Sequence, residues 1–298
     1  MHKGMQPIIL ALAGLLALSP TQAEDSEVSD PPQTAPATQP SSNEIELPPS
    51  IQNRKQEQRV RSKRPRGRPQ RDDRALEILD EMIDAYGGDE HLQGVSSRFI
   101  RSRQITGQGM EARETIITEY WKKPNLYRRE MDGQQGHSIM AYNGRYGWHD
   151  LAETGGGVTI APRSMNRYFD DLCRDINEPL SHLDEMNHLS YEGEQELDGR
   201  AVDVIRVTRP SGKIKILYID AENRRILQKD IAKYSEPDDI IGRRKFSDFR
   251  QVDRAWVPYV SIDGDGELRV EIIDFLPNQA IDDGIFDSPL PPMEDQDL

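Results

Sequence analysis

Cysteine is almost absent from this chain: Cys173 stands alone among 298 residues, so no intramolecular disulfide can form. A fold without disulfides depends on its hydrophobic core, and a body of about 220 residues is long enough to bury about 70% of its unfolded surface. Cys173 lies in the stretch YFDDLCRDI, with no histidine close to it in the sequence. Such a setting is typical of a small buried hydrophobe rather than of a nucleophile.

Sequence patterns of catalysis and metal binding are also lacking. No serine or cysteine occupies a nucleophile motif, and metal-ligand spacing is absent from four histidines of the body: His137, His149, His182 and His188. The glycines of TGGGV (residues 154–158) are not followed by the Lys and Ser or Thr of a phosphate-binding loop. We therefore expect no catalytic residue, no metal, no cofactor and no enzymatic activity.

One acidic stretch, DGDGE at residues 263–267, resembles part of a calcium-binding loop. Ser261 stands where the first Asp of such a loop belongs, and Ile272 stands where its closing Glu belongs. Asp-Gly pairs are also typical of tight hairpins. The stretch therefore favours a β-turn over a metal site.

The sequence has one long apolar run, from Pro7 to Leu18, and it is too short to span a bilayer comfortably. A weakly positive start precedes the run, Pro20 follows it, and Thr21 and Ala23 supply small residues before a cleavage point. This layout predicts a signal peptide over residues 1–23, cleaved after Ala23, and a periplasmic protein. A retained N-terminal anchor helix is the alternative.

Charge is unevenly distributed along the chain, whose formal net charge is −14. Residues 24–50 hold six acids, six prolines and no Lys or Arg, whereas residues 51–71 hold nine Lys and Arg against one Glu. Segments with so few aliphatic residues do not offset the entropy of ordering, so residues 24–71 are predicted to be a disordered tether. The remainder, residues 72–298, is left with −17.

The basic segment contains PRGRP at residues 65–69, the core of the AT-hook that lies in the minor groove of DNA. An exported chain does not meet DNA, and a body of charge −17 repels a phosphate backbone. We therefore expect no nucleic-acid partner. The predicted contacts of the segment are anionic surfaces such as lipid headgroups, and the residues concerned are Arg61, Lys63, Arg64, Arg66 and Arg68.

The folded body is expected over residues 72–290, followed by an acidic tail at residues 291–298. It opens with a predicted helix, capped by Asp72 or Asp73 and ended by Gly87-Gly88, with apolar residues at helical spacing: Leu76, Leu79, Ile83 and Tyr86. Alternating stretches then predict strands, with Asp132-Gly133 and Asn143-Gly144 as hairpin turns.

A helical stretch interrupts the strands. Its apolar face is predicted to hold Met165, Tyr168, Phe169 and Leu172, and Pro179 separates a second short helix carrying Leu183 and Met186. Strands then resume to the end of the body. The pattern predicts a β-rich α+β fold, a large curved antiparallel sheet of about ten strands with two helical insertions. The many acids are interpreted as solubilising residues on polar strand faces.

Several stretches together resemble the LolA/LolB-type superfamily, especially outer-membrane lipoprotein-sorting proteins. They are ALEILDEMIDAYGGDEHLQGVSSRFI, AYNGRYGWHD, LDGRAVDVIRVTRPSGKIKILYIDAENRRI, FSDFRQVDRAWVPYVSI and LPNQAIDDGIFDSP, which span residues 74–289. The resemblance implies an open antiparallel half-barrel with helices across its concave face and an apolar cavity for acyl chains. Carriers of this superfamily use an arginine to hold their lid, and the resemblance assigns that role to no residue here.

The function expected from this resemblance is non-enzymatic binding or transport of acyl chains of lipids or lipoproteins in the periplasm. The candidate ligand-binding residues are Trp148, Met165, Tyr168, Phe169, Leu172, Tyr218 and Trp256. Aromatic residues at helical spacing usually pack in a core, so ordinary packing is the alternative for each of them. The alternative function is a regulatory or scaffold module of the RseB/MucB type, which binds a partner protein.

Overall fold

The computed structural model describes residues 68–152, 155–176, 178–232, 239–264 and 266–290. The expected signal peptide, nearly all of the expected tether and the acidic tail lie outside the described residues. Among the described residues, no helix combines the length and the apolar character needed to cross a membrane.

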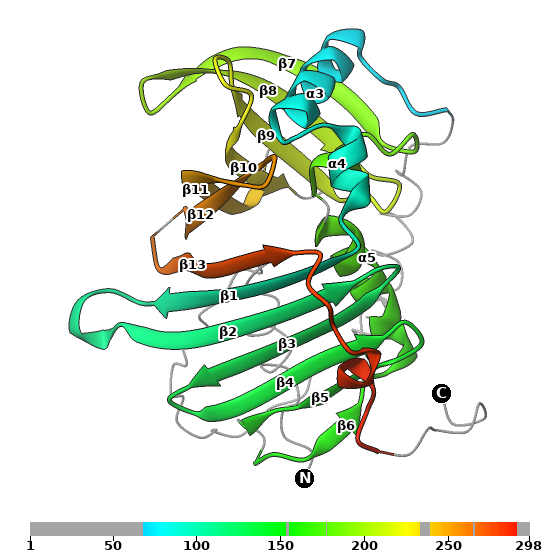
Figure 1. Ribbon diagram of the computed structural model, residues 1–298. Helices are drawn as coiled ribbons and strands as arrows, with labels where there is room; N and C mark the ends of the chain where they lie inside the picture. The colour runs from blue at the N-terminus through cyan, green and yellow to red at the C-terminus, as the bar shows by residue number, and fades with distance from the viewer. Residues whose placement is uncertain (1–67, 153–154, 177, 233–238, 265, 291–298) are drawn as a thin grey trace, which may run out of the picture.

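The described residues of the body form one open antiparallel sheet of thirteen strands, whose order is β6-β5-β4-β3-β2-β1-β13-β12-β11-β10-β9-β8-β7 (Figure 1). The predicted β-rich class and open half-barrel are confirmed, with thirteen strands in place of about ten. The strands are β1 (Ser97–Thr106), β2 (Arg113–Lys122), β3 (Leu126–Gly133), β4 (Gly136–Asn143), β5 (Gly147–Asp150), β6 (Val158–Ile160), β7 (His188–Leu197), β8 (Arg200–Thr208), β9 (Ile214–Asp220), β10 (Ile226–Ala232), β11 (Ile240–Val252), β12 (Ala255–Asp263) and β13 (Leu268–Pro277).

The two halves of the sheet are meanders that meet at the pairing of the first strand with the last. β1 pairs with β13 from Arg98↔Pro277 to Thr106↔Leu268. A bulge interrupts this pairing, because Arg101 faces Asp274 whereas Ser102 faces Ile272. A β-bulge bends its strand and increases the local twist, so the sheet changes direction at its centre.

A helix opens the body where the sequence predicts one. Helix α3 (Asp73–Ala85) begins at Asp72, whose carboxylate accepts hydrogen bonds from the backbone N–H groups of Arg74 and Ala75 at 2.9 and 3.2 Å. Gly87 follows the helix with a φ of +107°, a conformation that favours glycine.

Helix α3 packs against β7–β10, in front of them in Figure 1. Its fully buried residues are Ala75, Ile78, Leu79 and Met82, whereas the predicted core residue Leu76 is partly buried. Each fully buried aliphatic side chain contributes about 1.5–3 kcal/mol relative to exposure, so this cluster anchors one half of the sheet. A short helix, α4 (Asp89–Gly94), leads from α3 to β1.

The predicted helical insertion lies between β6 and β7. It consists of a 3₁₀ turn η3 (Arg163–Met165), α5 (Asn166–Ile176) and α6 (Glu178–His182). Helix α5 packs on the half of the sheet formed by β2–β4, through a cluster that includes Trp121, Tyr127 and Met140. Leu183 and Met186 follow the end of α6, and Met186 is exposed, so the prediction that they lie on a second helix is wrong.

Residues just before α3 pair with the edge strand β7. The backbone N–H of Leu189 donates to the carbonyl of Gln70 at 2.9 Å, and that of Asp72 donates to the carbonyl of Leu189 at 3.1 Å. The ordered contacts of the body thus begin two residues before its expected start.

Five aspartates of the described part of the chain are buried, so the interpretation of the acids as solubilising surface residues is wrong for these five. Asp175, Asp203, Asp220, Asp230 and Asp263 are each at most 5% exposed. Each forms an ion pair with at least one arginine, for example Asp230 with Arg243 at 2.7 Å. A buried carboxylate needs such a partner because desolvation penalises its charge.

Candidate functional site

An apolar pocket of about 210 Å³ opens at the centre of the sheet, between the α3–α4 segment and the α5–α6 segment. The helical segments contribute Tyr86, Leu92, Ile176 and Pro179 to its wall. The sheet contributes Arg98, Ile226, Phe246, Ala255, Trp256, Val257, Pro258, Ile272 and Phe275. With one cationic side chain in an otherwise hydrophobic wall, the pocket suits an apolar group.

The pocket exists because two neighbouring strands diverge. Residues 260–262 of β12 pair with residues 269–271 of β13. Within the part of the chain that the structure describes, residues 255–259 of β12 have no register partner in β13. The pocket wall takes side chains from both sides of this opening, including Trp256 and Pro258 from β12 and Ile272 and Phe275 from β13. Pro258 pairs with Phe249 of β11 and has no N–H to donate, so it suits a stretch without a partner on the β13 side.

Arg98 joins the wall of the pocket to the end of α5. Its Nη1 atom donates a 2.6 Å hydrogen bond to the carbonyl of Ile176, the last residue of that helix. Its guanidinium carbon lies 5.9 Å from the ring centroid of Trp121 and 5.2 Å from that of Phe275. Burial lowers the pKa of Arg98 to about 10, and the nearby Glu119 opposes this effect. Arg98 is therefore still a cation at neutral pH.

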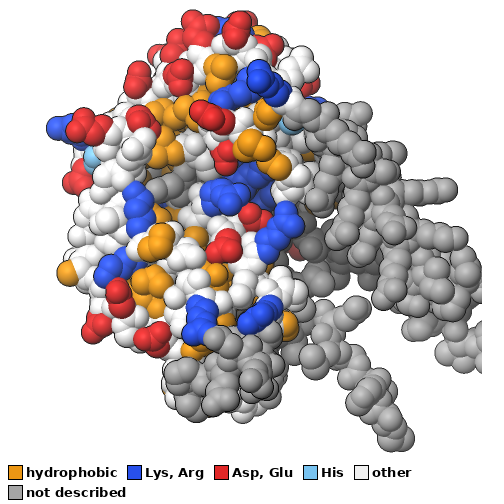
Figure 2. Space-filling model, turned by 90° about the vertical axis from the view of Figure 1, so that its right-hand side faces the viewer, with side chains coloured by type: hydrophobic (Ala, Val, Ile, Leu, Met, Phe, Trp, Pro, Cys, Tyr) orange, Lys and Arg blue, Asp and Glu red, His pale blue; other side chains and the backbone are white. Residues whose placement is uncertain are grey.

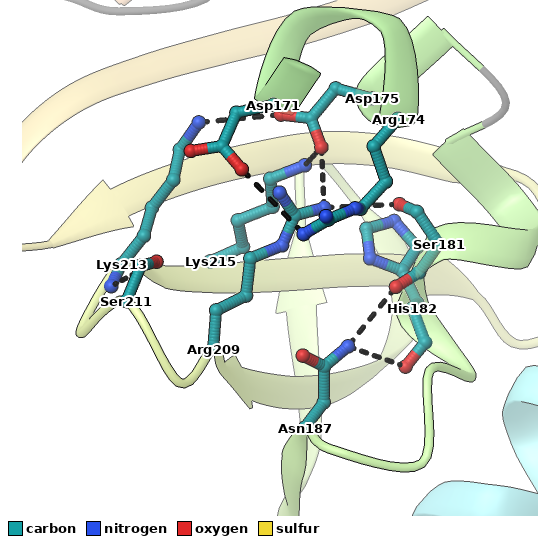
Figure 3. A network of polar contacts seen from close by, with 10 residues as sticks. All are labelled: Asp171, Arg174, Asp175, Ser181, His182, Asn187, Arg209, Ser211, Lys213 and Lys215. Atoms are coloured by element: carbon teal, nitrogen blue, oxygen red, sulfur yellow. Dashed lines mark hydrogen bonds and ion pairs between the residues drawn. The ribbon is translucent and has the colours of Figure 1, made fainter. Parts of the chain in front are cut away.

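The same end of α5 is held by a buried carboxylate (Figure 3). Three cations contact Asp175: Arg209, Lys213 at 3.3 Å and Lys215 at 3.4 Å. These cations come from the β8–β9 hairpin, and Arg209 also donates to Ser181 Oγ at 3.2 Å. The last turn of α5 is thus tied to β1 through Arg98 and to the β8–β9 hairpin through Asp175.

The four predicted ligand-binding residues of the helical insertion lie together beneath α5. Phe169 and Leu172 are buried, and Met165 and Tyr168 pack against the same cluster. The ring of Phe169 stacks on that of Tyr142, with centroids 5.0 Å apart and planes at 5°. In this arrangement the apolar face of α5 fills the space above β2–β4.

Two of the other three candidates lie on the opposite face of the sheet. Trp148 pairs with Ala141, which faces away from α5, and donates to the carbonyl of Phe286 at 2.9 Å. Tyr218 packs in a cluster with Val202 and Ile216, on the face opposite to α3. Trp256 lines the apolar pocket, with the guanidinium of Arg225 3.7 Å from its ring centroid.

The basic tether residues are mostly outside the described part of the chain. Arg68 is described and exposed, whereas Arg61, Lys63, Arg64 and Arg66 are not described. Seen from the right-hand side of Figure 1, hydrophobic side chains form separate patches, with Lys, Arg, Asp and Glu side chains between them (Figure 2). On this face the described residues present no continuous apolar surface.

Most residues of the pocket wall were not predicted from the sequence, including Arg98, Phe246, Ile272 and Phe275. They lie in three different strands, β1, β11 and β13, and no local pattern relates them. For Arg98 the sequence does hold a signal, because a charged residue stands directly before the apolar Phe99 and Ile100 in the first strand. Its role depends on Ile176 at the end of α5, which lies 78 residues further along the chain.

Cys173, which the sequence suggests is a small buried hydrophobe, is buried in the cluster beneath α5. Burial raises the pKa of the Cys173 thiol to about 12, with a smaller contribution from Asp170, so the thiol is neutral. Among the described residues, no group of three or more His, Cys, Asp and Glu side chains is arranged to hold a metal ion.

No known family model matches this chain, and no curated protein matches it. Solved structures do match it. A LolA superfamily protein from Nitrosomonas europaea is 13% identical with a TM-score of 0.50, and the match covers 72% of this chain and 97% of that one. At this identity the likeness concerns the fold: the chain has the LolA-like fold that its motifs predict.

Two further solved structures are similar to a lesser degree. A DUF1329 family protein from Desulfovibrio piger is 12% identical with a TM-score of 0.48, covering 72% of this chain and 97% of that one. An outer membrane lipoprotein-sorting protein domain from Vibrio parahaemolyticus is 13% identical with a TM-score of 0.47, covering 72% and 96%.

Proposed function

We propose that this chain is a non-enzymatic binding protein of the bacterial envelope that takes up an acyl chain of a lipid or lipoprotein in the apolar pocket. The observation that carries the proposal is the pocket itself, which lies between two helical segments at the opening between β12 and β13. The LolA-like fold supports the same class of function. The expected export signal, with cleavage after Ala23, supports a location in the periplasm.

The size of the pocket bears on how it would work. About 210 Å³ is below the ~300–1,000 Å³ of typical ligand sites. Burying a chain of about fifteen methylenes at ~0.8 kcal/mol each is worth on the order of 12 kcal/mol. Admitting such a chain requires α5 to move off β2–β4, so Met165, Tyr168, Phe169 and Leu172 would then face the ligand. In the empty protein the same residues refill the space, which favours release of the cargo.

The contacts at the end of α5 support this role for the helix. Arg98 and Asp175 hold the last turn of α5 through polar bonds, whereas its body is held by apolar packing around Phe169. Apolar packing can be exchanged for ligand contacts of the same kind. The polar bonds at Ile176 would then act as the hinge about which the helix opens.

Uptake of cis-parinaric acid, a fluorescent fatty acid, tests the proposal. Ile272→Asp places a charge in the pocket wall, and we expect it to weaken uptake at least about tenfold. Ile273→Asp is the matched control, because Ile273 is the next residue and is 42% exposed. Melting curves of both variants separate loss of binding from loss of folding.

Native mass spectrometry of protein purified from the envelope gives an independent test, since a bound lipid appears directly as added mass. A wild-type protein that carries no lipid and takes up no apolar probe would overturn the proposal. Co-purification of a membrane protein in place of lipid would then favour the alternative of a partner-binding module.

A further inference from the structure

A second pocket of about 180 Å³ adjoins the apolar pocket and differs from it in chemistry. The two pockets share Phe246, Pro258 and Ile272, so they lie side by side. The second one, called the polar pocket below, has polar or charged side chains in its wall: Ser102, Glu119, Lys229, Arg244 and Ser261. An apolar space is therefore continued by a polar one on the same concave face.

The two cations of the polar pocket lie directly opposite each other. Lys229 of β10 and Arg244 of β11 are register partners. Lys229 is 7% exposed, and the Arg244 side chain is 11% exposed. Like charges at directly opposite positions of a sheet are destabilising, and low exposure limits screening by water. Such a pair is stabilised when an anion lies between its members.

The surroundings of the pair show how these charges are held. The ammonium of Lys229 lies 5.7 Å from the ring centroid of Phe246, a residue shared by both pockets. Arg244 Nε lies 2.9 Å from Asp263 Oδ1, on the β12 side. Glu119, on the far wall, accepts a 2.5 Å hydrogen bond from the hydroxyl of Tyr127. Asp263 thus offsets part of the charge of Arg244 from outside the pocket, and the pocket wall itself carries Lys229 and Arg244 together with Glu119.

We propose that the ligand is a single-chain amphiphile with an anionic head group, a carboxylate or a phosphate. Its chain occupies the apolar pocket, and its head group binds between Lys229 and Arg244 in the polar pocket. The inference rests on the proposed uptake of an acyl chain. It adds the class of head group and the residues that recognise it.

The dimensions of the two pockets agree with this assignment. Each alone is smaller than a typical ligand site, whereas 210 and 180 Å³ together reach the lower end of that range. The hydroxyls of Ser102 and Ser261 add hydrogen-bond donors to the same wall. Hydrogen bonds from cationic donors to an anionic oxygen are about twice as strong as neutral ones.

The test compares cis-parinaric acid with parinaryl alcohol, which has the same chain and a neutral head. Wild-type protein is expected to bind the acid at least about tenfold more tightly than the alcohol. Lys229→Met and Arg244→Met are each expected to reduce this preference toward unity. Lys229→Arg, which keeps the charge, is expected to retain the preference.

Lys245→Met is the matched control, because Lys245 follows Arg244 on β11 and forms an exposed ion pair with Asp198. It is expected to behave as wild type. Competition with lysophosphatidic acid and with a fatty acid of equal chain length distinguishes a phosphate from a carboxylate head group.

Two outcomes overturn the head-group inference alone: equal affinity of the wild type for acid and alcohol, or a preference that survives both methionine variants. Displacement of the acid by inorganic phosphate alone would make the polar pocket a free-anion site and would likewise overturn it. Failure of the wild type to bind either probe would overturn the proposed function instead.

Discussion

The guanidinium of Arg98 and the carbonyl of Ile176 are joined by a 2.6 Å hydrogen bond, which links β1 to the last turn of α5. The residues are 78 positions apart in the chain, so this contact is a tertiary one. A cation at a helix C-terminus is favourable because the last carbonyls have no partner within the helix. The pair therefore sets where α5 ends above the sheet.

Arg98→Met is expected to loosen the last turn of α5 without unfolding the protein. A hydrogen bond from a charged group contributes about 1.5–3 kcal/mol, and methionine still packs against Trp121. Hydrogen exchange of amides near Ile176 should accelerate, and uptake of an apolar probe should become faster. Arg250→Met, which breaks an exposed ion pair with Asp248, is the control. Unchanged exchange in the Arg98 variant would contradict a holding role.

Gly147→Ala is expected to destabilise the protein by about 1–3 kcal/mol, the usual cost of overpacking. A Cβ atom at Gly147 would overlap the ring of Phe169. Gly94→Ala is the control, because a Cβ atom there meets nothing within 4 Å. Urea unfolding of both variants measures the difference. Equal stability of the two would mean that Phe169 is free to move off β5.

Asp175→Asn is expected to cost about 3–5 kcal/mol, because it leaves Arg209 and Lys215 buried without their carboxylate. Asp171→Asn, four residues earlier, removes a partly exposed carboxylate paired with Arg174 at 3.6 Å, and exposed pairs of this kind contribute about 0–1 kcal/mol. Chemical unfolding of both variants at neutral pH is the measurement. A small effect at Asp175 would show that the three cations do not depend on it.

The thiol of Cys173 is expected to resist labelling in the folded protein at pH 8 and to react once the protein unfolds. Burial raises its pKa from 9.0 to about 12. The unfolded thiol loses its proton first, so stability is full below pH 9 and falls as pH rises toward 12. Cys173→Ala should lessen this alkaline loss in unfolding curves between pH 8 and pH 11. Rapid labelling of the native thiol would contradict its burial.

The sequence predicted the ends of helices and strands correctly where the backbone needs a particular residue type, such as a capping Asp or a Gly with positive φ. Asp72 caps α3 and Gly87 ends it, as expected. The turn predicted at Asn143-Gly144 lies between β4 and β5, and Gly144 has a φ of +84° there. The turn predicted at Asp132-Gly133 lies further along the chain. Gly133 is still part of β3, where it pairs with Gly136 of β4, and of these two glycines Gly136 is the one with positive φ.

The site itself was largely beyond local reasoning. Trp256 was identified as a candidate and lies in the pocket wall, but Phe275 and Arg98 reach the same pocket only because β1 pairs with β13. Trp148 and Trp256 are both aromatic residues within predicted strands, and the sequence does not distinguish them. In the structure Trp148 lies on the face of the sheet away from α5, whereas Trp256 lies in the pocket wall where β12 diverges from β13. The Asp175 cluster was missed because its cations lie in a hairpin more than 30 residues away.

The pairing of β1 with β13 also has a kinetic consequence. Arg98 and Pro277 face each other across this pairing although nearly the whole body separates them in sequence. Bringing together two residues so far apart in sequence costs conformational entropy before any contact between them stabilises the fold. Folds with many such distant contacts therefore fold slowly. During synthesis the first meander is complete while the last strand is still missing. The edge of β1 therefore stays unpaired until residues 268–277 arrive, and it is the place where a newly made chain is most prone to aggregate with others.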